Sequence, residues 1–142
     1  MKKLSQHIMT IIVAATMLLC TLATTSCNGV GSPTLRAAVA IANQELPIDL
    51  GNGMTAVSIA IEDNYVVYVY EAPTEAVLIL QESDLKTLAY EELRLNIQQD
   101  EDVRTFMELC VESNYGIIYR YTDNDGNVAE ILISCSDTAT LL

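Results

Sequence analysis

Few residues in this sequence have the chemistry of a nucleophile or a base. The only histidine is His7, in an N-terminal stretch that we expect to be removed, so the remaining chain has no Ser-His or Cys-His pair and no histidine for zinc. Ser83 and Lys86 match S-x-x-K, a spacing that places both on one helical turn, where a lysine can activate a serine. The companion S-x-N and K-T-G motifs are missing, so a helix N-cap is the better interpretation of Ser83.

Carboxylates are abundant, but their spacing defines no site. Asp123, Asp125 and Asn127 alternate around a glycine, as in calcium loops, yet the EF-hand register would place Tyr121 and Leu132 at ligand positions. The same residue types favour a β-turn, so we expect a turn here and no metal or other cofactor. Acid–base catalysis requires paired carboxylates in unlike environments within one cleft, which spacing alone does not show.

Tyrosine is the most distinctive residue type, with seven copies and no tryptophan. Tyr68 and Tyr70 share one face of an expected strand, and Tyr119 and Tyr121 share one face of another. If both faces coincide and point to solvent, they form an aromatic, hydroxyl-bearing surface suited to a glycan or protein partner. The alternative is that the rings only stabilise the sheet by packing across strands, and this alternative is favoured.

The charge of the chain is strongly negative. All 19 acidic residues but only five of the seven basic residues follow residue 26, so this part carries a net charge of −14. Such a body repels nucleic acids and anionic lipid head groups, and we expect neither as a partner.

The N-terminal segment has the order of a secretory signal. Lys2 and Lys3 precede an uncharged, apolar stretch over residues 8–25, and small residues then lead to Ser26 and Cys27. This segment resembles a bacterial lipoprotein signal, most closely the Ser-Cys lipobox of Bacteroidota-type envelopes. The resemblance covers the leader only.

The resemblance implies that residues 1–26 are a signal peptide and that Cys27 carries a lipid. The protein would then be held to a membrane of the bacterial cell envelope and face the periplasm or the outside. Residues 27–32 would be a flexible tether. Two other outcomes remain open: cleavage that releases a soluble protein, or an uncleaved anchor, because about 18 uncharged residues is the lower limit of a membrane span.

Two cysteines remain once Cys20 leaves with the signal and Cys27 is lipidated. We predict a disulfide between Cys110 and Cys135, since the compartment allows oxidation. If residues 123–126 form the last hairpin loop, Cys135 lies opposite the residue one helical turn after Cys110. A register change of one residue would remove this argument, and two buried free thiols are the alternative.

Residues 33–142 are expected to form a single α+β domain. The patterns predict an antiparallel sheet of about four strands, made of two hairpins, with helices packed on one face. Residues 77–80 are apolar without periodicity, and we assign them to a short strand or extended core segment. The expected helices are residues 33–45 and two more that begin at Ser83 and Asp100, and the expected hairpins are residues 54–61 with 65–71 and residues 115–122 with 128–134.

From these observations we expect a small, envelope-anchored lipoprotein that binds or scaffolds and is not an enzyme. It would use the sheet face opposite the helices. The first alternative is a small periplasmic hydrolase that uses carboxylates or the Ser83–Lys86 pair. The second is a structural subunit of an envelope assembly that pairs with a neighbour through a sheet edge.

Overall fold

The computed structural model describes residues 32–142. The expectations for the signal segment, for the lipid on Cys27 and for most of the tether lie outside the described residues. The elements in chain order are α2 (Ser32–Asn43), β1 (Ile48–Gly51), β2 (Met54–Glu62), β3 (Tyr65–Glu71), α3 (Thr74–Glu82), α4 (Lys86–Gln99), α5 (Glu101–Glu112), β4 (Gly116–Thr122), β5 (Val128–Ile133) and α6 (Cys135–Ala139).

The five strands form one mixed sheet in the order β1-β2-β3-β4-β5. The α+β class and the two hairpins are confirmed, but the prediction of four antiparallel strands is wrong in two respects. β1 adds a fifth strand beside β2, and β3 pairs with β4 in parallel. The reason for the parallel pair is the connection: α3, α4 and α5 carry the chain back to the starting end of β3 before β4 begins.

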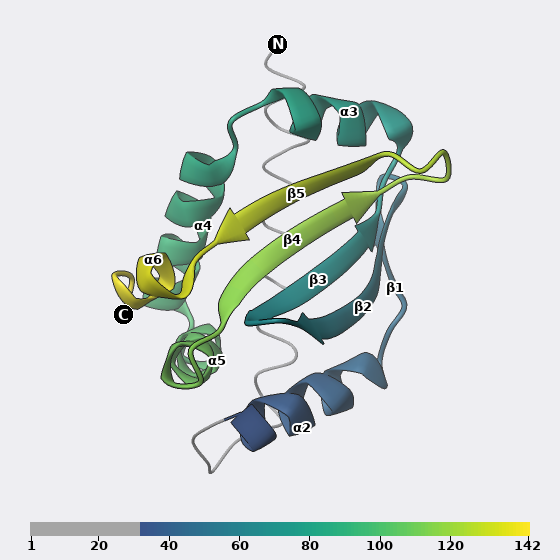
Figure 1. Cartoon of the computed structure of the whole chain (residues 1–142). Coiled ribbons are helices and arrows are strands. Elements are labelled where there is room, and N and C mark those ends of the chain that lie inside the picture. The colour runs from purple at the N-terminus through teal and green to yellow at the C-terminus, as the bar shows by residue number, and fades with distance from the viewer. Residues whose placement is uncertain (1–31) are drawn as a thin grey trace.

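The helices pack on one face of this sheet. α2 lies against β2, α3 and α4 lie against β5, and α5 packs on α4 and α6 (Figure 1). Apolar residues from these helices and from alternate strand positions form one core. Val67 and Ile118, although buried, belong to the opposite sheet face and are not part of that core.

The apolar run at residues 77–80 is helical, so its assignment to a strand is wrong. Within α3, Val77 and Leu80 are buried while Leu78 is exposed, which is the pattern of a helix with one covered face. The start of the next helix also differs from expectation. Ser83 is the C-cap of α3 and donates its hydroxyl to the carbonyl of Ile79 (2.8 Å), and α4 begins only at Lys86.

The start of α5 agrees with expectation. The side chain of Asp100 accepts hydrogen bonds from the backbone N–H groups of Asp102 (2.9 Å) and Val103 (3.4 Å). This N-cap satisfies backbone donors that have no partner inside the helix. The buried face of the helix that it starts, which includes Phe106 and Cys110, packs against the core.

The last hairpin is one residue out of the expected register. Thr122 pairs with Val128, so residues 123–127 form the loop, and the strand ends at Ile133 opposite Ile117. Cys135 is consequently not a strand residue but the first residue of α6.

Candidate interaction surface

The four tyrosines come together as expected, but on the covered face of the sheet. Tyr68 pairs with Tyr119 and Tyr70 with Tyr121 across the parallel strands. The ring centroids lie 5.7 Å apart in the first pair and 5.2 Å apart in the second. All four side chains are buried among the helices, so the prediction of a solvent-facing tyrosine surface is wrong and the packing alternative is confirmed.

The tyrosine hydroxyls have an unusual environment. Those of Tyr68, Tyr70 and Tyr121 are buried and have no hydrogen-bond partner. Burial, reinforced by neighbouring tyrosines and by the Cys110 thiol, raises the pKa of these hydroxyls and of Tyr119 well above the ordinary value, because the charged form would be desolvated. The four hydroxyls therefore stay neutral at physiological pH.

No helix of residues 32–142 covers the opposite face of the sheet (Figure 1). Its residues follow from the strand register, since directly paired residues share a face. A row of apolar side chains crosses four strands at Ala60, Val67, Ile118 and Leu132. The next row contains Arg120 and Glu130, with Val128 beyond them. We call this surface the open face.

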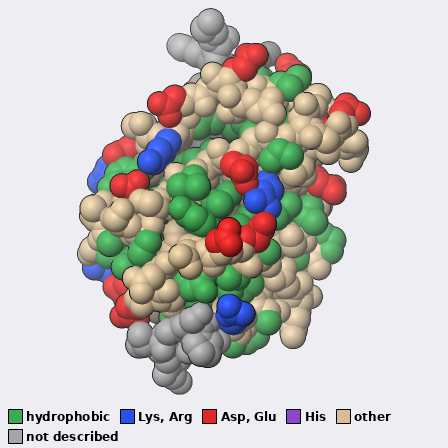
Figure 2. Space-filling model, viewed as in Figure 1, with side chains coloured by type: hydrophobic (Ala, Val, Ile, Leu, Met, Phe, Trp, Pro, Cys, Tyr) green, Lys and Arg blue, Asp and Glu red, His purple; other side chains and the backbone are tan. Residues whose placement is uncertain are grey.

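A cluster of three charges lies over the centre of the open face. Arg120 donates from Nε to Glu130 on β5 and from Nη1 to Glu62 on β2, both at 2.7 Å. These hydrogen bonds, that to Glu130 first, raise the pKa of Arg120. The cluster spans β3 and β4, which lie between β2 and β5, and so it covers Val67. Figure 2 shows a basic side chain flanked by acidic ones near the centre of the visible face, with hydrophobic side chains around them.

One end of the open face is closed by an aromatic ring. Tyr65 lies beside Gly116, and a Cβ at Gly116 would be 2.7 Å from Cε1 of Tyr65. The ring therefore occupies the space that a side chain at residue 116 would need, as occurs when an aromatic residue covers a glycine in a sheet. The sequence patterns predict an uncovered sheet face but place the tyrosines on it, whereas the structure buries them on the covered face. The residues that line the open face were missed because they are ordinary strand formers.

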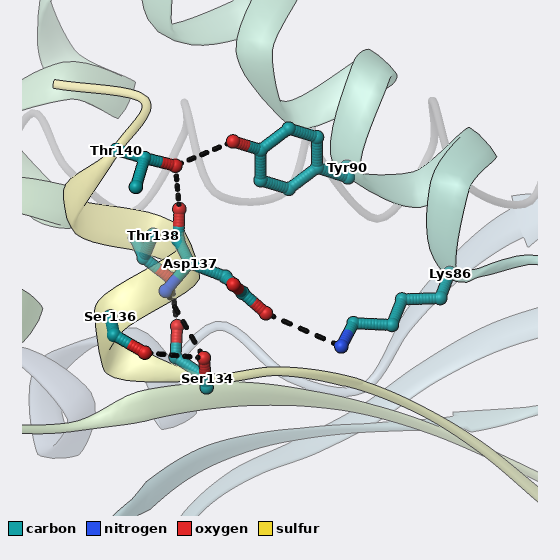
Figure 3. A network of polar contacts seen from close by, with 7 residues as sticks. All are labelled: Lys86, Tyr90, Ser134, Ser136, Asp137, Thr138 and Thr140. Carbon is teal, nitrogen blue, oxygen red and sulfur yellow. Dashed lines mark hydrogen bonds and ion pairs between the residues drawn. The ribbon is translucent and has the colours of Figure 1, made fainter.

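The proposed Ser83–Lys86 pair is not assembled. Lys86 forms an ion pair with Asp137 of α6 (3.3 Å), while Ser83 bonds within α3. Figure 3 shows that Lys86 and Tyr90 of α4 both reach the C-terminal segment. The hydroxyl of Tyr90 lies 2.5 Å from that of Thr140, the C-cap of α6. Ser134 caps the same short helix by accepting from the N–H of Asp137. This network attaches the C-terminal helix to α4.

The acidic turn between β4 and β5 is held together by its own first residue. Asp123 accepts hydrogen bonds from the backbone N–H groups of Asp125 (2.9 Å) and Asn127 (2.8 Å) and from the side-chain amide of Asn127 (2.7 Å). The bond from the Asn127 side chain is the main reason that the pKa of Asp123 is lowered. Within residues 32–142, no group of three or more His, Cys, Asp or Glu residues is arranged to hold a metal ion.

Cys110 and Cys135 are both free thiols in this structure, so the predicted disulfide is not formed here. The shifted register explains the difference, because Cys135 lies in α6, where its thiol points to the carbonyl of Val111 (3.8 Å). Burial raises the pKa of the Cys110 thiol, and the nearby Cys135 adds to this shift. The bond remains a prediction for the oxidised protein.

The described features define a two-layer α+β domain with one open sheet face. No helix in the described part of the chain is both long and apolar enough to cross a membrane. No protein-family model matches the sequence, and no curated protein matches it either.

Two solved structures are similar to this chain. A protein of Pseudomonas aeruginosa described as secreted has a TM-score of 0.57 at 10% identity, and the match covers 75% of this chain and 91% of that one. A pilotin of the type 2 secretion system of Vibrio vulnificus has a TM-score of 0.48 at 11% identity, covering 73% of this chain and 87% of that one. At 10% identity the first likeness shows a shared fold alone.

Proposed function

We propose that this chain is a small lipoprotein of the cell envelope that binds or scaffolds another molecule and does not catalyse a reaction. A lipid on Cys27 would hold it to a membrane, with the domain facing the periplasm or the outside. The observation that carries the proposal is the open face: a sheet surface that no helix of residues 32–142 covers, with hydrophobic side chains beside the Arg120 cluster. A surface of this kind is suited to recognition, since exposed apolar area next to fixed charges marks interaction sites.

The positions of the candidate catalytic groups also support a binding role. Ser83 bonds to a backbone carbonyl, Lys86 is paired with Asp137, and Asp123 organises its own turn. Each group thus has a local structural partner.

The P. aeruginosa protein with the same fold is described as secreted, which is consistent with an exported chain.

The class of partner follows from the charge and from the open face. A protein or a glycan fits a surface of this composition, while the net charge of −14 after residue 26 disfavours nucleic acid. The membrane is a partner only through the lipid.

Photo-cross-linking in intact cells tests the binding role. A photoreactive amino acid at Val69, which is half-buried in the middle of the open face, should yield a defined cross-linked product with another envelope component. The same amino acid at Leu95, which is exposed on α4, is the matched control and should yield none. Equal products from both positions, or no product from Val69, would contradict the proposed role.

Metabolic labelling tests the anchor separately. Cells supplied with a labelled fatty acid should yield a labelled protein, and Cys27→Ser should abolish the label. Cys20→Ser is the matched control, because Cys20 lies inside the expected signal and its loss should leave the label unchanged. An unlabelled wild type, or a labelled Cys27→Ser variant, refutes lipidation at this cysteine.

A further inference from the structure

The two borders of the sheet differ in how they are protected. At the β1 border, the strand has four residues and is irregular between Asp49 and Gly51. Where β1 no longer covers β2, the side-chain amide of Asn43 bonds both the N–H and the carbonyl of Ile59. Short strands, irregularities and covering side chains are the usual means of preventing strand addition.

At the β5 border, α3 and α4 pack beside the strand, but a covering side chain of the described region reaches the outward backbone groups only at the first residue of β5. The N–H of Asp123 bonds the carbonyl of Asn127, so Asn127 points its backbone groups toward β4. The backbone N–H and C=O groups of successive residues point to opposite sides of a strand. The backbone groups of Val128, Glu130 and Leu132 therefore point away from the sheet. The carbonyl of Val128 accepts from the side chain of Gln81 (2.7 Å). The backbone groups of Glu130 and Leu132 have no such partner among residues 32–142.

Hydrophobic side chains flank this free edge on both sides. Val128 and Leu132 are 43% and 41% exposed on the open face. Leu78 is 43% exposed on α3, one helical turn before Gln81, which reaches the same edge. In Figure 1, α3 and α4 lie along the β5 border of the sheet. Three of the five large hydrophobic residues that are exposed in the described region thus surround one strand edge.

The charge on α3, which lies beside the edge, is negative, and Lys86 at the start of α4 is paired with Asp137. α3 carries Glu75 and Glu82, three residues before and four after Leu78, and it contains no basic residue. Both glutamates are exposed, and neither forms an ion pair with a residue that the structure describes. A second copy of this chain would bring a further net charge of −14 and be repelled. A partner segment with lysine or arginine would be attracted.

We propose that the β5 edge binds an extended, basic segment of another protein as a sixth strand. The inference rests on the proposed binding function, extends the binding surface from the open face to the adjoining β5 edge, and names the partner class. The backbone groups of Glu130 and Leu132 supply the pairing, as in other complexes formed by strand addition. Apolar side chains of the segment contact Leu78 on one side and Val128 and Leu132 on the other, and its basic side chains face Glu75 and Glu82.

A short peptide of alternating lysine and valine residues is the probe. It is added to the full-length protein, and binding is followed by fluorescence anisotropy and by amide hydrogen exchange. We expect salt-sensitive binding, slower exchange at the amides of Glu130 and Leu132, and unchanged exchange in β1. A matching peptide of glutamate and valine should not bind.

Two variants locate the site. Leu132→Pro removes an outward N–H without breaking a β4–β5 hydrogen bond, and it should weaken binding about tenfold. Leu78→Lys changes only the surface of α3 and should weaken binding through repulsion, which keeps the test decisive if the proline variant does not fold. Ile41→Ser, at a residue 41% exposed on α2, is the matched control and should bind as the wild type does.

Three results would overturn the inference. They are no binding of the basic peptide, equal binding of the acidic peptide, or binding that neither Leu132→Pro nor Leu78→Lys weakens. Slower exchange at Glu130 and Leu132 without peptide, as protein concentration rises, would show that a second copy is the occupant and would also overturn it. If Val69 forms its cross-link while the peptide fails to bind, the binding function stands and only the β5-edge inference falls.

Discussion

The rings of Tyr70 and Tyr121 are stacked at 5.2 Å between parallel strands, and neither hydroxyl has a hydrogen-bond partner. The aromatic contact stabilises the centre of the sheet, while each buried, unpaired hydroxyl costs free energy. The pair therefore makes a favourable contribution to the free energy of folding through its rings and an unfavourable one through its hydroxyls.

Removing only the hydroxyl separates these two terms. We expect Tyr70→Phe and Tyr121→Phe to leave the free energy of unfolding unchanged or to raise it by about 1 kcal/mol, since ring stacking is kept and an unpaired polar group is lost. Urea denaturation measures this. Tyr90→Phe is the matched control and should destabilise slightly, because its hydroxyl lies in contact with Thr140. Marked destabilisation by the first two variants would show that the hydroxyls have a partner in solution.

Asn43 is expected to contribute strongly to stability. Its side chain bonds both backbone groups of Ile59, so Asn43→Ala leaves a half-buried N–H and carbonyl unpaired. The free energy of unfolding should fall by about 1–3 kcal/mol. Gln44→Ala, at the exposed neighbouring residue, should have little effect. If both variants unfold at the same urea concentration as the wild type, the Asn43 contacts are unimportant.

Gly116 has no room for a side chain. Gly116→Ala would place Cβ 2.7 Å from Cε1 of Tyr65 and 2.8 Å from the carbonyl oxygen of Ile133. We expect a loss of about 1–3 kcal/mol in the free energy of unfolding. Adding Tyr65→Ser should restore only part of this loss, because the contact with the Ile133 backbone remains. A Gly116→Ala protein as stable as the wild type would contradict this geometry.

The stability of the last hairpin turn is expected to depend on the protonation state of Asp123. Hydrogen bonds, chiefly from the side chain of Asn127, hold its pKa below the ordinary value of 3.8. A carboxylate with a lowered pKa stabilises the folded turn above its unfolded pKa, and this contribution is lost as the pH falls through the folded pKa. An NMR titration should therefore give Asp123 a midpoint below 3.8. A midpoint at or above that value would rule out the hydrogen bonds in solution.

The two thiols should differ in reactivity. Burial raises the pKa of Cys110, and the thiolate is the reactive form, so native Cys110 should be alkylated much more slowly than the half-buried Cys135. Peptide mass spectrometry follows each residue. In protein unfolded without reductant, alkylation of both residues indicates the free thiols of this structure, whereas protection of both until reduction indicates the disulfide.

Local patterns in the sequence were sufficient for most secondary structure. The hairpin partners, the first helix and the start of α5 at Asp100 depend on alternation, helical spacing and turn chemistry within a few residues. That Tyr68 and Tyr70 share a face follows in the same way, because side chains alternate along a strand.

Tertiary structure decided the rest. Whether a tyrosine face is covered depends on which side the helices pack, and tyrosine suits either environment, with an apolar ring and a polar hydroxyl. Residues 77–80 form a helix because Val77 and Leu80 have a core to face, while four apolar residues have no readable period of their own. The parallel pairing of β3 with β4, which leaves β5 at an open border, results from contacts between segments more than 40 residues apart. Such contacts depend on the packing of the whole chain and leave no local signal in the sequence.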